Sequence, residues 1–203
     1  MDSVDVVALL SRPSVEVAPL LLDWRLSHTT EDGTVTAAIT EVEAYAGTSD
    51  PASHAFRGPS ARTQVMFGSA GRLYSYFSYG MHWCCNVVTG PEGQASAVLL
   101  RAGRIVEGVD LARARRGERV PDRALARGPA CLAQALAIGR DQNGADLLDG
   151  GALGLRATEP AEPAAISSGP RVGVSVAHEV PWRFWVTGDP SVSTYKRSPR
   201  ARH

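Results

Sequence analysis

The 203-residue chain carries no net formal charge and is 44% hydrophobic, so it can bury the core of one domain. Its three cysteines include an adjacent pair and no Cys-x-x-Cys spacing, which argues against a disulfide framework and a zinc ribbon. Acidic residues stand where a secretory signal has basic ones, and no apolar run approaches the length of a membrane span. We therefore expect a cytoplasmic protein without membrane contact, folded as one domain over residues 1–203 with flexible termini at 1–8 and 193–203.

The first 45 residues predict two short helices that are separated near Pro13, then a turn into a strand. In residues 34–45, apolar side chains alternate with threonines at the period of two that is typical of a strand with one buried side. Residues 48–71 are rich in Pro, Ser, Gly and Ala, which indicates a long loop that carries function rather than core.

The rest of the chain predicts more strands than helices. Three strands are expected, at 72–79, 83–89 and 95–103. Two helices follow, at 104–117 and 128–139. Residues 140–168 are expected to be mostly loop, before two last strands at 171–176 and 182–188. Because short turns join most of the strands, we expect an α+β fold in which helices pack around an antiparallel sheet.

Common cofactor motifs are absent from the sequence. The stretch "GSAGR" lacks both the Lys-Ser/Thr end of a Walker loop and the Gly-x-Gly-x-x-Gly order of a dinucleotide site. The five histidines include no His-x-x-x-His pair, and no Gly-x-Ser-x-Gly elbow occurs. We therefore predict no metal and no nucleotide cofactor.

Strand periodicity places Glu41, Glu43 and Tyr45 on the face that carries the buried apolar side chains of residues 34–45. A charged carboxylate is costly to bury, and one held near an apolar wall is suited to proton transfer. Periodicity equally allows the strand to leave the core after Ile39, with both glutamates in water. The loop that follows places a histidine and a phenylalanine among small residues, which is typical of a lined pocket and favours burial.

Arg101 extends the apolar row of its own predicted strand in the same way. A buried arginine without a carboxylate partner is costly, so pairing with Glu43 or Glu41 would resolve both burial problems. Such a pair can also hold a water molecule. The alternative is an interior ion pair that takes no part in chemistry.

Five motifs resemble the alkyladenine (3-methyladenine) DNA glycosylase family, in family order and spacing from about Leu10 to Val192. They are "EVEAYAGTSDPASHAF", "RLYSYFSYGMHWCCN", "AVLLRA", "GPACLAQALAI" and "PRVGV". The resemblance implies a curved antiparallel sheet in a mixed α/β fold. It also implies a monofunctional, metal-free enzyme of base excision repair that cuts the N-glycosidic bond of alkylated or deaminated purines. Its partner would be damaged double-stranded DNA, in the nucleoid if the source is bacterial, and no obligate protein partner is implied.

The resemblance implies a role for each matching residue. Glu43 would be the general base that activates water, and Arg101 and the backbone carbonyl of Val172 would help to hold that water. The extracted base would be sandwiched by three side chains, Tyr45, His54 and Tyr76. Asn86 would stand where the amino group of guanine would clash, and Leu99 would line the floor.

Tyr79 would push into the gap that the extracted base leaves, with Met81 and His82 beside it. Regular alternation places Tyr74 with Tyr76 on one strand face, while the Ser78–Gly80 turn can direct Tyr79 outward. Phe77 and Trp83 are predicted to lie in the core. The sequence departs from the family pattern at His82 and Trp83, where an aromatic residue followed by Phe is usual.

A neutral chain with a single lysine is unusual for a DNA-binding protein. The segment 101–127, with eight arginines and four acids, would supply the contacts to the DNA backbone. The expected contact residues are Arg104, Arg113, Arg115 and Arg116. On composition alone, a solvated helix face is the alternative interpretation.

Two other functions use similar residues. An O-glycoside hydrolase also combines two carboxylates with aromatic platforms, although its carboxylates flank the bond, whereas Glu41 and Glu43 lie on one side of any substrate. A non-catalytic nucleic-acid-binding module would use the tyrosines and arginines, but would have no need of Glu43 and Arg101 on buried faces.

Overall fold

One long strand, β2 (Gly33–Tyr45), organises the fold in a computed structural model that describes residues 3–158 and 165–201. Along one edge β2 pairs with β5 (Ala97–Glu107), and along the other it pairs first with β1 (Arg25–Thr30) and then with β8 (Arg183–Val186). Register shifts interrupt its pairing with β5 between Ile39 and Val42. Such irregularities bend a strand, which lets β2 serve two successive partners on one edge.

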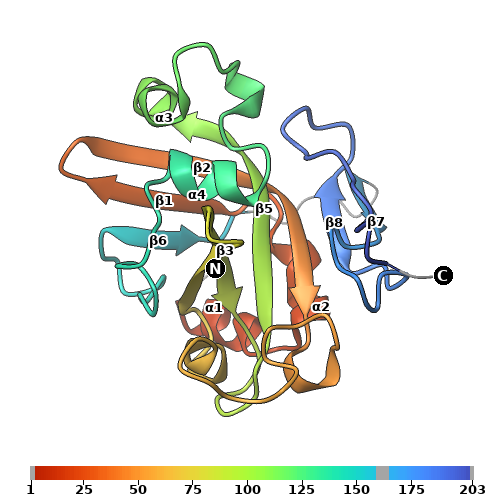
Figure 1. Cartoon of the computed structure of the whole chain (residues 1–203). Helices are drawn as coiled ribbons and strands as arrows, with labels where there is room; N and C mark the ends of the chain where they lie inside the picture. Colours follow the sequence, from red (N-terminus) through yellow and green to blue (C-terminus); the bar gives the residue numbers. More distant parts are fainter. Residues whose placement is uncertain (1–2, 159–164, 202–203) are drawn as a thin grey trace.

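The remaining strands extend this sheet on both sides. Beyond β5 lie β4 (His82–Val88) and β3 (Leu73–Ser78), beyond β1 lies β6 (Leu153–Arg156), and β8 carries β7 (Ile166–Gly169). Every one of these strand pairs is antiparallel. The described strands therefore form one curled sheet of eight strands. Within it, β7 and β8 form a pair that branches from β2 and lies to one side of the other six strands (Figure 1). The α+β fold with a curved antiparallel sheet is confirmed.

Short helices complete the fold. The α-helices are α1 (Ser3–Leu10), α2 (Ser14–Val17), α3 (Val109–Arg116) and α4 (Pro129–Ala135). Short 3-10 helices lie at Ala18–Leu21, Gly47–Ser49, Gln64–Phe67 and Asp122–Ala124. The main apolar core joins the α-helices to the sheet through side chains such as Leu10, Leu100 and Leu132. A second, smaller cluster packs Met66 of the Gln64–Phe67 helix with Tyr74 and Val88. None of the described helices is long and apolar enough to cross a membrane.

Two predicted elements differ from the structure. Residues 171–176 form an irregular loop rather than a strand, because the Val172 amide donates to the Glu43 side chain rather than to a strand carbonyl, and Gly173 has φ +72°. Residues 140–168 are mostly loop where they are described, as expected, and hold only β6 and the first residues of β7; residues 159–164 lie outside the described residues. The helix expected at 104–117 begins only at Val109, because β5 continues to Glu107.

Strand β2 is buried on both faces rather than on one. Two of its three threonines, expected on a solvent side, are buried and bonded: Thr36 donates to Glu107, and Thr40 lies 2.7 Å from the Ser191 hydroxyl. Burial of these polar side chains is tolerated because each has a hydrogen-bonding partner. The elements that cover this second face come from distant parts of the sequence.

Both segments expected as flexible termini make specific contacts where they are described. Ser3–Leu10 forms helix α1, with Val6 in the core. Near the other end, Ser193 bonds to Glu41, and the Lys196 carbonyl accepts from the Gly173 amide at 3.1 Å. Residues 1–2 and 202–203 lie outside the described residues.

Gly47 allows the loop after β2 to approach the segment that leads into β5. Its φ is +58°, and a Cβ there would lie 1.9 Å from the Ala95 carbonyl oxygen. Gly58, in the same loop, also has a positive φ of +90°, but a Cβ there would meet nothing within 4 Å.

Backbone strain alone at such a position costs about 1–3 kcal/mol. We expect Gly47→Ala to lower the free energy of unfolding by more than this, because the clash with Ala95 adds to the strain. Gly58→Ala should cost only about 1 kcal/mol, from strain alone. Urea denaturation of both variants measures the difference. Equal losses would show that the close approach to Ala95 carries no energetic weight.

Candidate active site

A pocket of about 600 Å³ opens where the ends of four strands meet two loops. Its walls come from β2, β3, β4 and β5, from the loop around residues 51–54, and from the loop 172–176. The pocket brings together Glu43, Tyr45, His54, Tyr76, Tyr79, Asn86, Leu99, Arg101 and Val172. All of the side chains expected to catalyse or to hold the base therefore line one cavity.

Glu43 is fully buried on β2 and has three partners. Its Oε1 accepts a hydrogen bond from the Val172 backbone amide at 2.7 Å and lies 3.3 Å from Arg101 Nη1. Its Oε2 accepts from the Tyr45 hydroxyl at 2.8 Å. The carboxylate is therefore held in one orientation at the pocket wall, which is the arrangement that a positioned proton acceptor needs.

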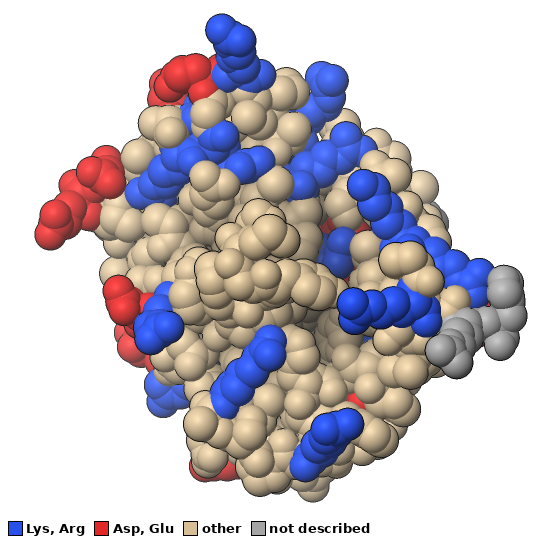
Figure 2. Space-filling view, in the orientation of Figure 1, with Lys and Arg blue, Asp and Glu red and all other residues tan. Residues whose placement is uncertain are grey.

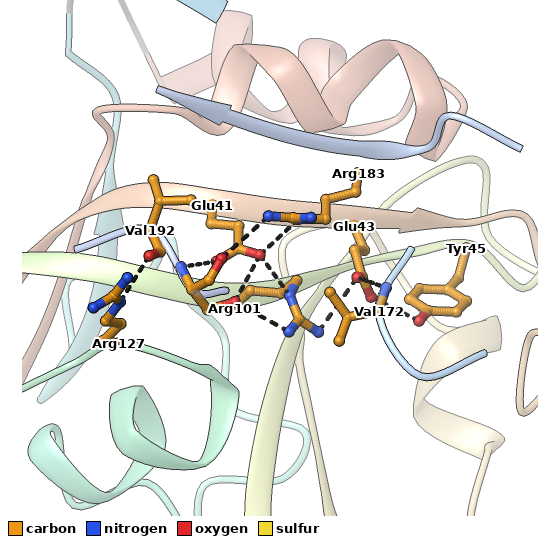
Figure 3. A network of polar contacts seen from close by, with 9 residues as sticks. Glu41, Glu43, Tyr45, Arg101, Arg127, Val172, Arg183 and Val192 are labelled. Atoms are coloured by element: carbon orange, nitrogen blue, oxygen red, sulfur yellow. Dashed lines mark hydrogen bonds and ion pairs between the residues drawn. The ribbon is translucent and has the colours of Figure 1, made fainter. Parts of the chain in front are cut away.

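Glu41 lies two residues before Glu43 and is also fully buried. Its Oε1 accepts from the Nε atoms of Arg101 and Arg183, each at 2.8 Å, and its Oε2 accepts from the Ser193 amide at 2.7 Å. Figure 3 shows Glu41 between the two arginines, and Glu43 between Arg101, Val172 and Tyr45. Arg101 thus contacts both carboxylates, which confirms the predicted pairing and excludes the interpretation with both glutamates in water.

Tyr45 is held from two sides. Burial, and then the neighbouring Glu43 carboxylate, raise the pKa of Tyr45 well above its ordinary value, so the hydroxyl stays protonated and donates. The Arg171 guanidinium lies 4.7 Å from the centre of the Tyr45 ring. Arg171 is itself buried and forms a bidentate pair with Asp50, at 2.5 and 2.9 Å. The pair anchors the loop after β2 against the loop that carries Val172.

Aromatic side chains form the opposite wall. The rings of Tyr74 and Tyr76 stack with centroids 5.5 Å apart, and His54 meets the Tyr76 ring edge-on at 4.6 Å. Arg62 lies over the Tyr76 ring, 5.2 Å from its centroid. Burial against these rings, and then the charge of Arg62, lower the pKa of His54 to about 4, so this imidazole is neutral near pH 7. Burial also raises the pKa of Tyr76 well above its ordinary value.

Asn86 and Leu99 face each other across the β4–β5 pair at the base of the pocket. The Asn86 side-chain amide donates to the Tyr74 backbone carbonyl at 3.0 Å, which fixes its position beside the aromatic wall. Both side chains are almost fully buried. Any base that enters the pocket would meet them at a fixed position.

The β3–β4 hairpin projects a ridge of apolar side chains. Tyr79 is 86% exposed and Met81 65% exposed, and His82 beside them is also exposed. Tyr79 has φ +50°, a strained conformation for an aromatic residue, which directs its ring away from the sheet. Phe77 was expected in the core but is 47% exposed, because it lies at the hairpin end of β3, where its ring packs against that of Trp83 with the centroids 5.2 Å apart. The partly buried Trp83 packs against the core, as predicted.

The four arginines expected at the DNA backbone already bond within the protein. Arg104 pairs with Asp189 and Asp23, and Arg113 with Asp110 and Asp122. Arg115 and Arg116 donate to backbone carbonyls of α4 and of the segment before it. These bonds show that the arginine-rich segment has a structural role, whatever it contacts outside the protein.

Sequence reasoning missed several residues of the site. Asp50, Arg171, Arg183 and Ser193 support the pocket from behind, and Arg62 reaches its mouth. Two of these lie in segments that the sequence predicted as strands, where periodicity indicates a face but no partner. Within residues 3–158 and 165–201, no cluster of three or more His, Cys, Asp or Glu side chains could hold a metal ion.

Comparison with known proteins places this site in a family. Residues 8–190 match the family described as methylpurine-DNA glycosylase (MPG), and the chain belongs to it. The protein is therefore a DNA glycosylase, a hydrolase of N-glycosyl bonds that acts on DNA in repair. This membership excludes the O-glycoside hydrolase and the non-catalytic module as alternatives.

Several relatives carry the provisional name 3-methyladenine DNA glycosylase. The Streptomyces avermitilis protein is 53% identical over 196 residues, which cover 95% of this chain and 92% of the relative. The Leifsonia xyli protein is 54% identical over 194 residues, covering 92% and 90%. The Nocardia farcinica protein is 50% identical over 182 residues, covering 87% and 86%.

We expect Asp50→Asn to lower the free energy of unfolding by about 3–5 kcal/mol, because it leaves the Arg171 charge buried without a carboxylate. Glu16→Gln is the matched control, since it removes the carboxylate of the half-exposed Arg12–Glu16 pair and should cost about 0–1 kcal/mol. Chemical denaturation measures both variants. Similar losses in the two would contradict a supporting role for the Asp50–Arg171 pair.

NMR titration of the His54 ring should give a midpoint near pH 4, so the neutral imidazole persists through the physiological range. Arg62→Gln should raise that midpoint, because it removes a cation that opposes protonation. Arg57→Gln removes a cation from the same loop without removing a contact to His54, and should leave the midpoint unchanged. A wild-type midpoint near pH 6.5 would contradict the described environment.

Proposed function

We propose that the protein flips alkylated or deaminated purines out of duplex DNA into this pocket and hydrolyses their N-glycosidic bond. The observation that carries the proposal is the buried, oriented Glu43 carboxylate in a pocket with aromatic walls. A base stacked in a duplex cannot reach a buried carboxylate, so the reaction needs extrusion, at a cost of a few kcal/mol.

Stacking of the flipped base on aromatic side chains offsets part of the cost of extrusion. Tyr45, His54 and Tyr76 line the pocket, and base–aromatic stacking contributes about 1–3 kcal/mol per base. The neutral His54 avoids repulsion of a cationic alkylated purine. Its ring nitrogens lie 3.3 Å from the Tyr74 hydroxyl and 3.4 Å from Arg62 Nη2, so it would bond to the edge of the purine by exchanging one of these partners. Asn86 and Leu99 limit the shape of the base at the floor. Specificity for damaged purines would then have two sources: the electron-rich aromatic rings favour a cationic base, and the fixed side chains of Asn86 and Leu99 restrict its shape.

In the proposed reaction, Glu43 accepts a proton from a water molecule while the water oxygen forms a bond to C1′ of the sugar. The N-glycosidic bond breaks, its electron pair leaves with the purine, and an abasic site remains. Arg101 and the Val172 carbonyl would hold the water, since the Val172 amide already donates to Glu43. An N3- or N7-alkylated purine leaves as a neutral base, so it needs no general acid.

The hairpin ridge of Tyr79, Met81 and His82 would fill the space that the flipped base leaves. Lys and Arg side chains surround the centre of the face shown in Figure 2, while Asp and Glu lie mainly along its left edge. A neutral chain can thus present a basic face to DNA. The phosphate contacts would come from Arg104, Arg113, Arg115 and Arg116, which would exchange or share their present partners. An exposed ion pair between an arginine and a carboxylate stabilises the fold only slightly, so losing one to a phosphate costs little.

We expect Glu43→Gln to slow excision by at least about a hundredfold, because an amide cannot accept the proton from water. Binding to lesion-containing duplex should persist, since the pocket walls are unchanged. The assay is incubation with an oligonucleotide duplex bearing hypoxanthine or an alkylated purine, followed by alkali to reveal abasic sites. Glu31→Gln, in the exposed β1–β2 turn, serves as the control. Near wild-type turnover by Glu43→Gln would remove Glu43 from the role of base.

A further inference from the structure

Two carboxylates and two guanidinium groups share one buried cluster, of which Glu43 and Arg101 line the pocket and Glu41 and Arg183 do not. Glu41 and Glu43 are 0% exposed, Arg101 is 6% exposed and Arg183 is 5% exposed. The formal charges of the four groups sum to zero. Balance matters here, because an uncompensated charge in a buried site costs several kcal/mol.

The partners within this cluster are divided unequally. Arg183 is the direct cross-strand neighbour of Glu43 in the β2–β8 pair, yet its Nε donates to Glu41 at 2.8 Å. Arg101 donates its Nε to the same Glu41 oxygen at 2.8 Å, and its Nη1 lies 3.3 Å from Glu43. Glu41 therefore has two close guanidinium partners, whereas Glu43 contacts only Arg101 among these two arginines, and at a longer distance.

The same bonds hold Arg183 away from substrate. Its guanidinium lies over the rings of Trp185 and Tyr195, at 4.5 and 5.7 Å, and its Nη2 donates to the Ser193 carbonyl at 3.2 Å. Arg183 is not among the residues that line the described pocket. Arg183 can therefore act on the reaction only from outside the pocket, through its charge and its bond to Glu41, and not by contact with the substrate.

We propose that Arg183 is a positioning residue for the glycosylase reaction: by neutralising Glu41, it leaves the charge of Arg101 available to Glu43. Without Arg183, Glu41 and Glu43 would compete for one guanidinium, and the cluster would carry a net charge of −1. A carboxylate in a more negative site binds a proton more readily. Glu43 would then lose its proton-accepting form at a higher pH. This inference rests on the proposed role of Glu43 as the base.

Other ionisable groups also face Glu43. They are Tyr45 on β2, Tyr76 on β3, Cys84 on β4 and Arg171 on the loop before Val172. None of these bonds to Arg183 or to Glu41. Substitutions at Arg183 and Glu41 therefore change the charge behind Glu43 and leave its remaining neighbours in place.

The test is the pH dependence of single-turnover excision from a duplex that bears a cationic N7-methylated purine, with enzyme in excess. This leaving group needs no protonation, so the acid limb of the profile reports the base on the enzyme. We expect Arg183→Gln to move the acid limb to higher pH by about one unit, and so to slow excision about tenfold at a pH on that limb. Arg183→Lys keeps the charge and should keep the wild-type midpoint.

A second pair of variants tests the same charge in another background, in case Arg183→Gln alone does not fold. Glu41→Gln leaves two guanidinium groups with one carboxylate and should move the acid limb to lower pH. Adding Arg183→Gln restores neutrality and should return the midpoint toward the wild-type value. Thermal melting of each variant establishes which of them are folded.

The outcomes separate this inference from the proposed function. If the wild type excises no lesion, or if Glu43→Gln excises normally, the proposed function fails. If Glu43→Gln is inactive but Arg183→Gln retains the wild-type midpoint, Arg183 is only structural and the inference is overturned, even where the rate falls. An unchanged midpoint between Glu41→Gln and the double variant would overturn it equally.

Discussion

The structure depends on the neutralisation of two carboxylates that lie two residues apart on one buried strand. Glu41 and Glu43 sit where β2 bends between β5 and β8, and each needs partners because burial of a free carboxylate is costly. Arg101 comes from β5, Arg183 from β8, and Ser193 from the segment beyond it. This requirement draws three distant parts of the chain to one point behind the pocket.

The two carboxylates then differ in their surroundings. Glu41 accepts from two guanidinium groups and from the Ser193 amide and hydroxyl, with no contact to the pocket. Glu43 faces the pocket and accepts from neutral donors, with Arg101 at a longer distance. When two neighbouring carboxylates differ in their cationic partners, the one with more partners stays a structural anion and the other can take part in proton transfer.

The arginines serve structure before they serve recognition. Arg171 closes the back of the pocket through Asp50, and the guanidinium groups of Arg113 and Arg116 bond to side chains and carbonyls around α3 and α4. The net charge of zero therefore says little about any one surface, because many opposite charges are paired locally. The distribution in Figure 2 is the relevant quantity for a polyanionic partner.

Local periodicity in the sequence was enough to place Glu41, Glu43 and Tyr45 on one strand and to require a carboxylate partner for Arg101, because alternation depends on neighbouring residues alone. The motifs were enough to indicate the family. Only the tertiary structure decided that Arg183 would bond to Glu41, that Arg171 would bond to Asp50, and that Phe77 would be exposed. These outcomes join residues more than one hundred positions apart in sequence, or depend on what covers a strand face, and a local pattern contains no information about either.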